Sequence, residues 1–337
     1  MSFSLLGARA PTTLNSFVAK ISDGNASSRR CRPLDRAALR RSLLHADALP
    51  RRYFFGAAHF LAARSQHAAT VERLADFLGA NLYSARLAGH GYRGADGGDG
   101  DDPAAEAGAS LRDAATADAL FRNAADAAAV GCALGERVVL FGCSTGGALC
   151  TWVAASKNFG HNVAAVVLIS PAFSLASKAY PALKAVKAAL DFCLPRARAT
   201  RAMAAVLEAA QGKVKAPAHV ACEAHARYWT LTYPTAALLH LVEVIGVAAT
   251  VDVSAIECPS LIVGSHADPA VAWSKTLERY AAFGGTKALL TTARNAAENN
   301  HVLCNALLSP SSVGPLEDAI LAFAKPLVAE KCALDDA

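Results

Sequence analysis

The stretch "VVLFGCSTGGAL", from Val138 to Leu149, carries the strongest structural signal in this sequence. It opens with four apolar residues typical of a buried strand, and the residues from Gly146 to Ala155 favour a helix. Between them lies Gly142-Cys143-Ser144-Thr145-Gly146, which fits the pattern G-x-S-x-G. A serine on a strand-to-helix turn needs small neighbours, because its backbone is strained and the helix packs close behind it. We therefore interpret Ser144 as a candidate nucleophile, with an ordinary Gly/Ser turn as the alternative.

Strand-like runs alternate with helical stretches along the rest of the chain. We expect strands at Tyr53–Ala58, Asn81–Arg86, Arg137–Phe141, Val163–Ser170, Ser260–Gly264 and Lys287–Thr292. We expect helices over 65–80, over Ala104–Leu134, directly after Ser144 and over Leu316–Lys325. This alternation predicts an α/β fold with a doubly wound, mostly parallel sheet that is covered on both faces.

Two segments break the alternation. Residues Gly94 to Gly108 are rich in Gly and Asp and are expected to form a loop. The segment from Ser174 to Thr250 is mostly helical, is interrupted by prolines and has no strand signal. An insertion of helices between two halves of such a sheet predicts a cap over the edge where α/β sheets bind ligands.

The 337 residues therefore divide into four parts: a basic N-terminal extension over 1–52, a first core part over 53–173, the helical cap over 174–250 and a second core part over 251–337. The extension accounts for the net charge of +5, and the rest of the chain is slightly acidic. It could be a transit-type segment, because it is rich in Arg and Ser, or a solvated arm.

Composition excludes several classes of protein. No basic stripe with interleaved aromatic residues is present outside the extension, so we expect no nucleic-acid partner. The longest apolar run, Ala236 to Val251, is interrupted by His240 and Glu243, so we expect a soluble protein without a membrane span. The nine cysteines occur singly, which indicates reduced thiols and a cytoplasmic location, or an organelle if the extension is a transit peptide. The Gly/Asp-rich segment lacks calcium-loop spacing, so we expect no metal.

A serine nucleophile needs a base that takes its proton and a carboxylate that orients the base. In hydrolases with the G-x-S-x-G turn, the acid and then the histidine follow the serine along the chain. Asp268 follows the strand expected at Ser260–Gly264, and His301 lies in a polar loop after the last expected strand. We therefore predict a Ser144-Asp268-His301 triad.

Other interpretations of these loops stay open. Asp268 could simply begin a turn before Pro269, and His301 could be a satisfied histidine at a helix end. Glu298 could replace Asp268 as the acid, although it shares the loop of the histidine. We expect His266 to lie at the surface of its loop and His90 to be structural.

With these residues, the sequence resembles the α/β-hydrolase superfamily and, within it, the branch of monoacylglycerol lipases and carboxylesterases. The resemblance runs from about Tyr53 to the C-terminus and is weakest in the cap. It is carried by "RLAGHG" (Arg86–Gly91), "GCSTGG" (142–147), "LISPAF" (Leu168–Phe173), "CPSLIVGSHADPAV" (Cys258–Val271) and "NNHVL" (Asn299–Leu303). It implies a serine nucleophile at Ser144, an acid at Asp268, a base at His301 and no cofactor.

The resemblance also implies an oxyanion hole made of two backbone N–H groups. One belongs to Thr145, after the nucleophile. The other follows a His-Gly-x turn in the family, which corresponds here to His59-Phe60-Leu61, so the second expected donor is Leu61. Phe60 stands where the family has glycine, and a positive φ there would strain it. Because of this departure, a second function class stays open: an inactive protein with the hydrolase fold that binds a small apolar ligand or a protein partner.

The favoured function is a serine ester hydrolase, either a carboxylesterase or a monoacylglycerol-lipase-like enzyme, that works through an acyl-enzyme. We expect its substrate to carry an apolar acyl chain of medium length, held by apolar residues of the cap. Transient contact of the cap with a membrane surface stays open. The expected lining residues of the cap are Leu183, Val186, Leu190, Phe192, Leu238, Leu239, Leu241 and Val242.

Overall fold

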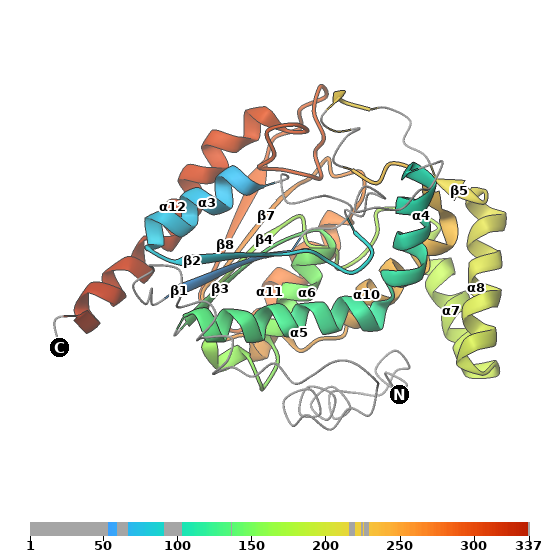
Figure 1. Cartoon of the computed structure of the whole chain (residues 1–337), viewed down its shortest axis with the longest axis horizontal. Helices are drawn as coiled ribbons and strands as arrows, with labels where there is room; N and C mark the ends of the chain where they lie inside the picture. The colour runs from blue at the N-terminus through green and yellow to red at the C-terminus, as the bar shows by residue number, and fades with distance from the viewer. Residues whose placement is uncertain are drawn as a thin grey trace.

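The computed structural model describes residues 53–58, 67–90, 103–135, 137–215, 220–223, 225 and 229–335. Figure 1 shows a central sheet with helices on both of its faces. The N-terminal extension over 1–52 and the expected oxyanion turn at 59–61 lie outside the described residues.

Six strands form one sheet in the order β2-β1-β3-β4-β7-β8, and each neighbouring pair runs parallel. The strands are β1 (Tyr53–Ala58), β2 (Asn81–Ala85), β3 (Arg137–Cys143), β4 (Val163–Ile169), β7 (Ser260–Ser265) and β8 (Lys287–Thr292). From β1 the chain adds β2 on one side and then crosses to β3 on the other. Parallel α/β sheets bind ligands beyond the carboxyl ends of their strands at such a switch point. The expected parallel α/β fold is confirmed.

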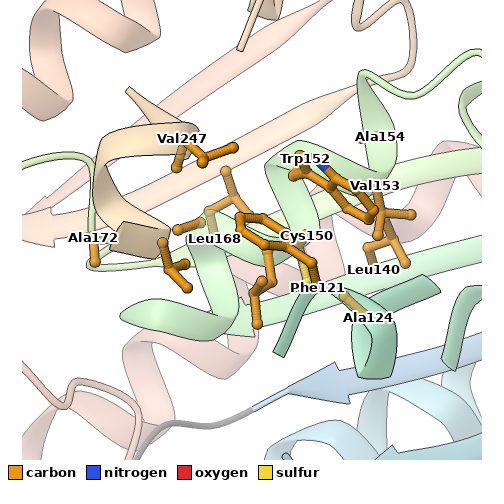
Figure 2. Packing of buried hydrophobic residues seen from close by; sticks show 14 of the residues in the cluster. Phe121, Ala124, Leu140, Cys150, Trp152, Val153, Ala154, Leu168, Ala172 and Val247 are labelled. Carbon is orange, nitrogen blue, oxygen red and sulfur yellow. The ribbon is translucent and has the colours of Figure 1, made fainter. Parts of the chain in front are cut away.

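Two layers of helices cover the sheet, because successive strand residues point to opposite faces. Val139 and Phe141 of β3 pack with α3 (Ala68–Leu78) and α12 (Pro310–Asp335) on one face. Val138 and Leu140 pack on the other face, with α5 (Ala117–Leu134), α6 (Thr145–Ala154) and α10 (Leu238–Ala248). Figure 2 shows the second cluster, with Trp152 of α6 against Phe121 of α5, their ring centroids 5.0 Å apart. The sheet is therefore doubly wound, as expected.

Further elements are the helices α4 (Pro103–Ala114) and α11 (Trp273–Ala282) and the 3-10 turns η2 (Gly160–Asn162), η3 (Thr235–Ala237) and η4 (Val253–Ala255). Among the helices that the structure describes, none is long and apolar enough to cross a membrane.

The stretch expected to form a single helix over Ala104–Leu134 is in fact two helices. They are separated at Thr116, whose side chain caps α5 by accepting the N–H of Ala119 at 3.2 Å. The expectation of a loop up to Gly108 is wrong for its last six residues, because α4 begins at Pro103. Proline suits a first helical position, where its missing N–H costs nothing. The closing helix, α12, is also longer than expected.

The segment over 174–250 contains α7 (Tyr180–Cys193), α8 (Arg196–Gln211) and α10. The expectation that it lacks strands is wrong, since β5 (Val214–Lys215) pairs antiparallel with β6 (Tyr233–Pro234). Helix α10 is apolar on most sides, and Val244 and Ile245 are fully buried in the core that it shares with α6. A helix of this kind belongs in a core. The last part of the segment therefore belongs to the helical layer on the α6 face of the sheet, where it packs against α5 and α6.

Candidate active site

Ser144 lies at a sharp turn between β3 and α6, with φ 54° and ψ −117°. A non-glycine residue adopts positive φ only where its surroundings force it, at a cost of roughly 1–3 kcal/mol. The neighbouring glycines show what forces it here. A Cβ on Gly142 would lie 2.4 Å from the carbonyl oxygen of Gly146, and one on Gly147 would lie 2.9 Å from Cβ of Pro171. The sequence pattern is thus explained by close packing behind the serine.

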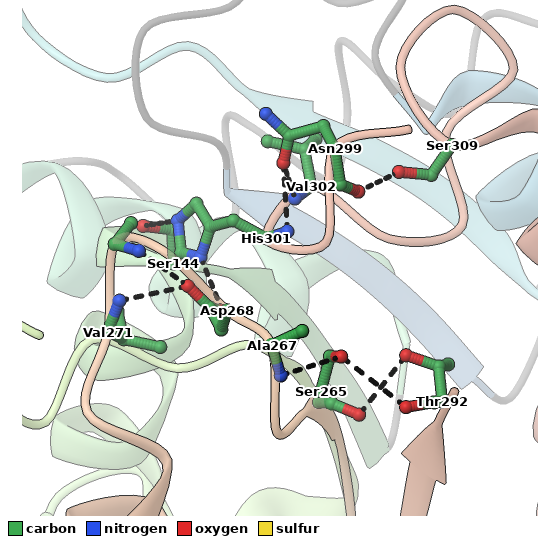
Figure 3. A network of polar contacts seen from close by, with 12 residues as sticks. Ser144, Ser265, Ala267, Asp268, Val271, Thr292, Asn299, His301, Val302 and Ser309 are labelled. Atoms are coloured by element: carbon green, nitrogen blue, oxygen red, sulfur yellow. Dashed lines mark hydrogen bonds and ion pairs between the residues drawn. The ribbon is translucent and has the colours of Figure 1, made fainter. Parts of the chain in front are cut away.

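The structure brings Ser144, His301 and Asp268 together from three separate loops (Figure 3). Nε2 of His301 lies 2.9 Å from Oγ of Ser144, and its Nδ1 lies 2.8 Å from Oδ2 of Asp268. A carboxylate can only accept, so Nδ1 carries the proton and Nε2 is free to accept the serine proton. The three predicted residues form a continuous hydrogen-bonded chain.

Asp268 is oriented by the backbone that follows it. Its Oδ1 accepts the N–H groups of Ala270 at 2.8 Å and Val271 at 2.9 Å, which leaves Oδ2 for His301. The Asp268 side chain is only 1% exposed. Three hydrogen bonds satisfy a buried carboxylate, which would be costly to leave unpaired. From the sequence, Asp268 is expected either to start a turn or to be the partner of the histidine. In the structure it has both roles.

The loop that carries His301 is shaped by Asn299, which the sequence analysis did not single out. Oδ1 of Asn299 accepts the backbone N–H groups of His301 and Val302, both at 2.8 Å (Figure 3). Asparagine is typical of turns in which a side chain accepts the backbone N–H two residues later. The asparagines in "NNHVL" were therefore the sequence signal for this turn.

The competing residues have other partners. Glu298 accepts the N–H and hydroxyl of Ser311, at 3.0 and 2.8 Å, and so joins its loop to the start of α12. His266 packs edge-on against Trp273, with ring centroids 5.5 Å apart. His90 is buried, its Nδ1 donates to the carbonyl of Ala88 at 2.8 Å, and burial lowers its pKa to about 4.

Thr145, the expected oxyanion donor that the structure describes, is buried as the first residue of α6. The N-terminal N–H groups of a helix have no partners within the helix and suit a developing negative charge. The second expected donor, Leu61, lies outside the described residues. In the part of the chain that the structure describes, no three His, Cys, Asp or Glu side chains are grouped as metal ligands.

The segment that leads into α7 starts directly beside the site. Leu175 and Val271 form an antiparallel bridge, and the N–H of Ala272 donates to the carbonyl of Ser174 at 2.9 Å. Since Val271 also donates to Asp268, this backbone contact joins the start of the expected cap to the loop of the acid.

Several of the expected lining residues have other roles. Leu183 and Leu190 of α7 pack against Met203 and Leu207 of α8, so they hold these two helices together. Phe192 is 92% exposed. Val242 belongs to the main core, because α10 packs against α5 and α6. The expectation that these residues line a pocket is wrong for this group, because Leu183, Leu190 and Val242 pack between helices and Phe192 is exposed.

Comparisons with known proteins identify the family and the fold. The family model for serine aminopeptidase, S33, matches residues 61–298. A structure from work on LipS and LipT, two metagenome-derived lipolytic enzymes, is 19% identical, with a TM-score of 0.55 over 84% of this chain and 96% of that one. A monoacylglycerol lipase of Paleococcus ferrophilus is 17% identical, with a TM-score of 0.51 over 84% and 96%. At this identity the two structures establish the fold. A search of the curated proteins finds no match.

Proposed function

Because the chain belongs to the serine aminopeptidase S33 family of α/β-hydrolases, we propose that it is a serine ester hydrolase that works through an acyl-enzyme. The observation that carries the proposal is the hydrogen-bonded chain from Ser144 through His301 to Asp268. The lipolytic enzymes and the monoacylglycerol lipase that share the fold favour an ester as the scissile bond.

In the proposed reaction, Nε2 of His301 takes the proton of Ser144 as Oγ attacks the ester carbonyl. Asp268 stabilises the imidazolium that forms. The backbone N–H of Thr145, with that of Leu61 as second donor, stabilises the oxyanion. His301 then protonates the leaving alcohol, which departs and leaves Ser144 acylated. A water molecule, deprotonated by His301, hydrolyses the acyl-enzyme and restores the serine.

Fluorophosphonate labelling tests this proposal most directly, because such a probe reacts with a serine that has a base and an oxyanion hole. We expect a single adduct at Ser144, and we expect Ser144→Ala to lose labelling and about 10⁴-fold or more of its turnover without unfolding. Labelling at another serine, or undiminished turnover in the variant, would contradict the proposal. No labelling of the wild type would favour the inactive, ligand-binding alternative. A preference for amino-acid p-nitroanilides over p-nitrophenyl esters would point to peptide-bond cleavage.

We further propose an apolar acyl chain in the substrate, with monoacylglycerol-like lipids as the leading class. The support is the lipolytic enzymes and the monoacylglycerol lipase that share the fold, together with the start of the cap segment beside Asp268. An apolar lining gains roughly 0.8 kcal/mol for each CH₂ that it buries. We therefore expect kcat/KM across p-nitrophenyl esters from acetate to palmitate to rise to an optimum at medium chains. A steady decline from acetate onwards would indicate a short-acyl esterase instead.

A further inference from the structure

His67 is a buried histidine far from the triad in sequence, and it contacts two elements of the site. It precedes α3, and its Nε2 lies 2.8 Å from the carbonyl oxygen of Leu303, two residues after His301. Its ring packs against Phe141 of β3, with centroids 5.8 Å apart, and Phe141 lies three residues before Ser144. One imidazole thus contacts both the strand that leads to the nucleophile and the loop of the base.

The chemistry of this contact defines the state of His67. A carbonyl can only accept, so Nε2 of His67 carries a proton and donates it to Leu303. Burial lowers the pKa of His67 to about 4, so the ring is neutral at neutral pH. His67 is therefore a stable, uncharged donor at a fixed place in the fold, and it has no need to exchange protons during turnover.

A second contact joins α3 to the same loop. Oγ1 of Thr70 donates to the carboxylate of Glu317 at 2.7 Å. The hydroxyl proton is used there, so the thiol of Cys304 must be the donor to Oγ1 of Thr70, at 3.3 Å. Glu317 belongs to α12 and also pairs with Arg73 of α3. Helix α3 is thereby held to α12, beside which it lies in Figure 1, and offers a rigid support to the loop.

The contacts made by Asn299 and Ser309 have a different role, because they lie within the loop itself. Asn299 donates its N–H to the carbonyl of Leu308 at 2.8 Å and accepts from Ser309 (Figure 3). Such bonds hold the shape of the loop but do not fix its position relative to the sheet. The contacts from His67 and Thr70 can fix this position, because these residues belong to another part of the fold.

We propose that His67 is a positioning residue for the base: by donating to Leu303 it holds the loop so that His301 reaches Ser144 and Asp268 together. This inference rests on the proposed function of the triad. A displacement of about 1 Å in a catalytic group can cost about 10²-fold in rate. Loss of the donor should therefore lower kcat and leave substrate binding largely unchanged.

The test compares variants of His67 in the full chain with p-nitrophenyl butyrate as substrate. His67→Leu removes the donor and keeps an apolar side chain of similar size, and we expect kcat to fall by about 10- to 100-fold with KM within about threefold. His67→Gln places an amide N–H near the position of Nε2, and we expect it to keep kcat within about threefold of the wild type. His67→Asn carries the same amide one CH₂ short, and we expect it to resemble the leucine variant.

Val71→Ala is the matched control, because Val71 lies in the first turn of α3 just after His67, is 1% exposed and packs in the core without contacting the loop by hydrogen bonds. It should lower the melting temperature and keep kcat. Proton NMR adds a readout without substrate: the Nδ1 proton of His301, assigned by its loss in His301→Ala, should shift or broaden in the leucine variant and not in Val71→Ala.

The outcomes separate this inference from the function on which it rests. Wild-type protein without Ser144-dependent turnover or labelling would overturn the proposed function. Active wild type with unchanged kcat in His67→Leu, or with equal losses in the leucine, glutamine and Val71 variants, would overturn the positioning role alone. If His67→Leu does not fold, the comparison of His67→Gln with His67→Asn decides in the same way.

Discussion

At the scale of single residues, the backbone N–H groups that orient Asp268 also determine which nitrogen of His301 carries the proton. Oδ1 is held by the N–H groups of Ala270 and Val271, so an asparagine at this position would keep its carbonyl oxygen there and turn its NH₂ towards His301. Nδ1 of His301 would then have to accept, and Nε2 would carry the proton. We expect Asp268→Asn to fold normally and to lose about 10⁴-fold in kcat, measured with a p-nitrophenyl ester alongside a thermal melt.

Asp252→Asn is the control for this substitution. Asp252 also accepts a backbone N–H, that of Ser254 at 3.0 Å, but it lies at an exposed turn before η4. The Asp252→Asn variant should have the same activity as the wild type. Equal activity of Asp268→Asn and wild type would show that the carboxylate does not set the tautomer.

At the scale of elements, the turn between β3 and α6 depends on backbone contact that leaves no room for a side chain. A Cβ on Gly142 would lie 2.4 Å from the carbonyl oxygen of Gly146 and 2.7 Å from the nitrogen of Gly147. These are backbone atoms of α6, so relief requires the helix to move. We expect Gly142→Ala to lose roughly 1–3 kcal/mol of stability, measured by urea unfolding, and about 10²-fold or more in kcat.

Gly246 in α10 is the matched glycine, because a Cβ there would meet nothing within 4 Å. Alanine favours a helix over glycine by up to about 1 kcal/mol, so Gly246→Ala should be neutral or stabilising, with full activity. Similar losses in the two variants would refute the steric explanation of the turn.

At the scale of the whole molecule, two of the buried histidines, His67 and His90, link folding to pH. Burial lowers the pKa of each from 6.5 to about 4. Between these values the unfolded chain binds a proton at each ring and the folded protein does not. The free energy of unfolding should therefore fall as the pH drops from about 6.5 to 4, by on the order of 3 kcal/mol for each ring, and the loss should end below that range.

Urea unfolding at several pH values between about 7 and 4 measures this slope. His67→Gln removes one of the two titrating rings and should reduce the slope, whereas substitution of the exposed His161 by glutamine should leave it unchanged. A free energy of unfolding that is level across this range would contradict the buried, neutral state of the two rings.

The sequence by itself determined the strand, the turn and the helix around Ser144, because the apolar run and the closely spaced glycines act within a dozen neighbouring residues. It also indicated the parallel sheet, since alternating strands and helices can bury their apolar faces only by stacking in layers. Chain order and loop position were enough to predict Asp268 and His301, although not the distances between them.

Only the tertiary structure decided what depends on contacts between distant segments. His301 and Ser144 are 157 positions apart, and they meet because parallel strands bring their carboxyl ends to one edge of the sheet. Helix α10 packs into the core against α5 and α6, and its apolar sequence would suit a cap equally well, because side-chain composition does not reveal which partner buries it. His67 likewise precedes an ordinary amphipathic helix, and its bond to Leu303 exists only because folding places α3 against the loop of the base.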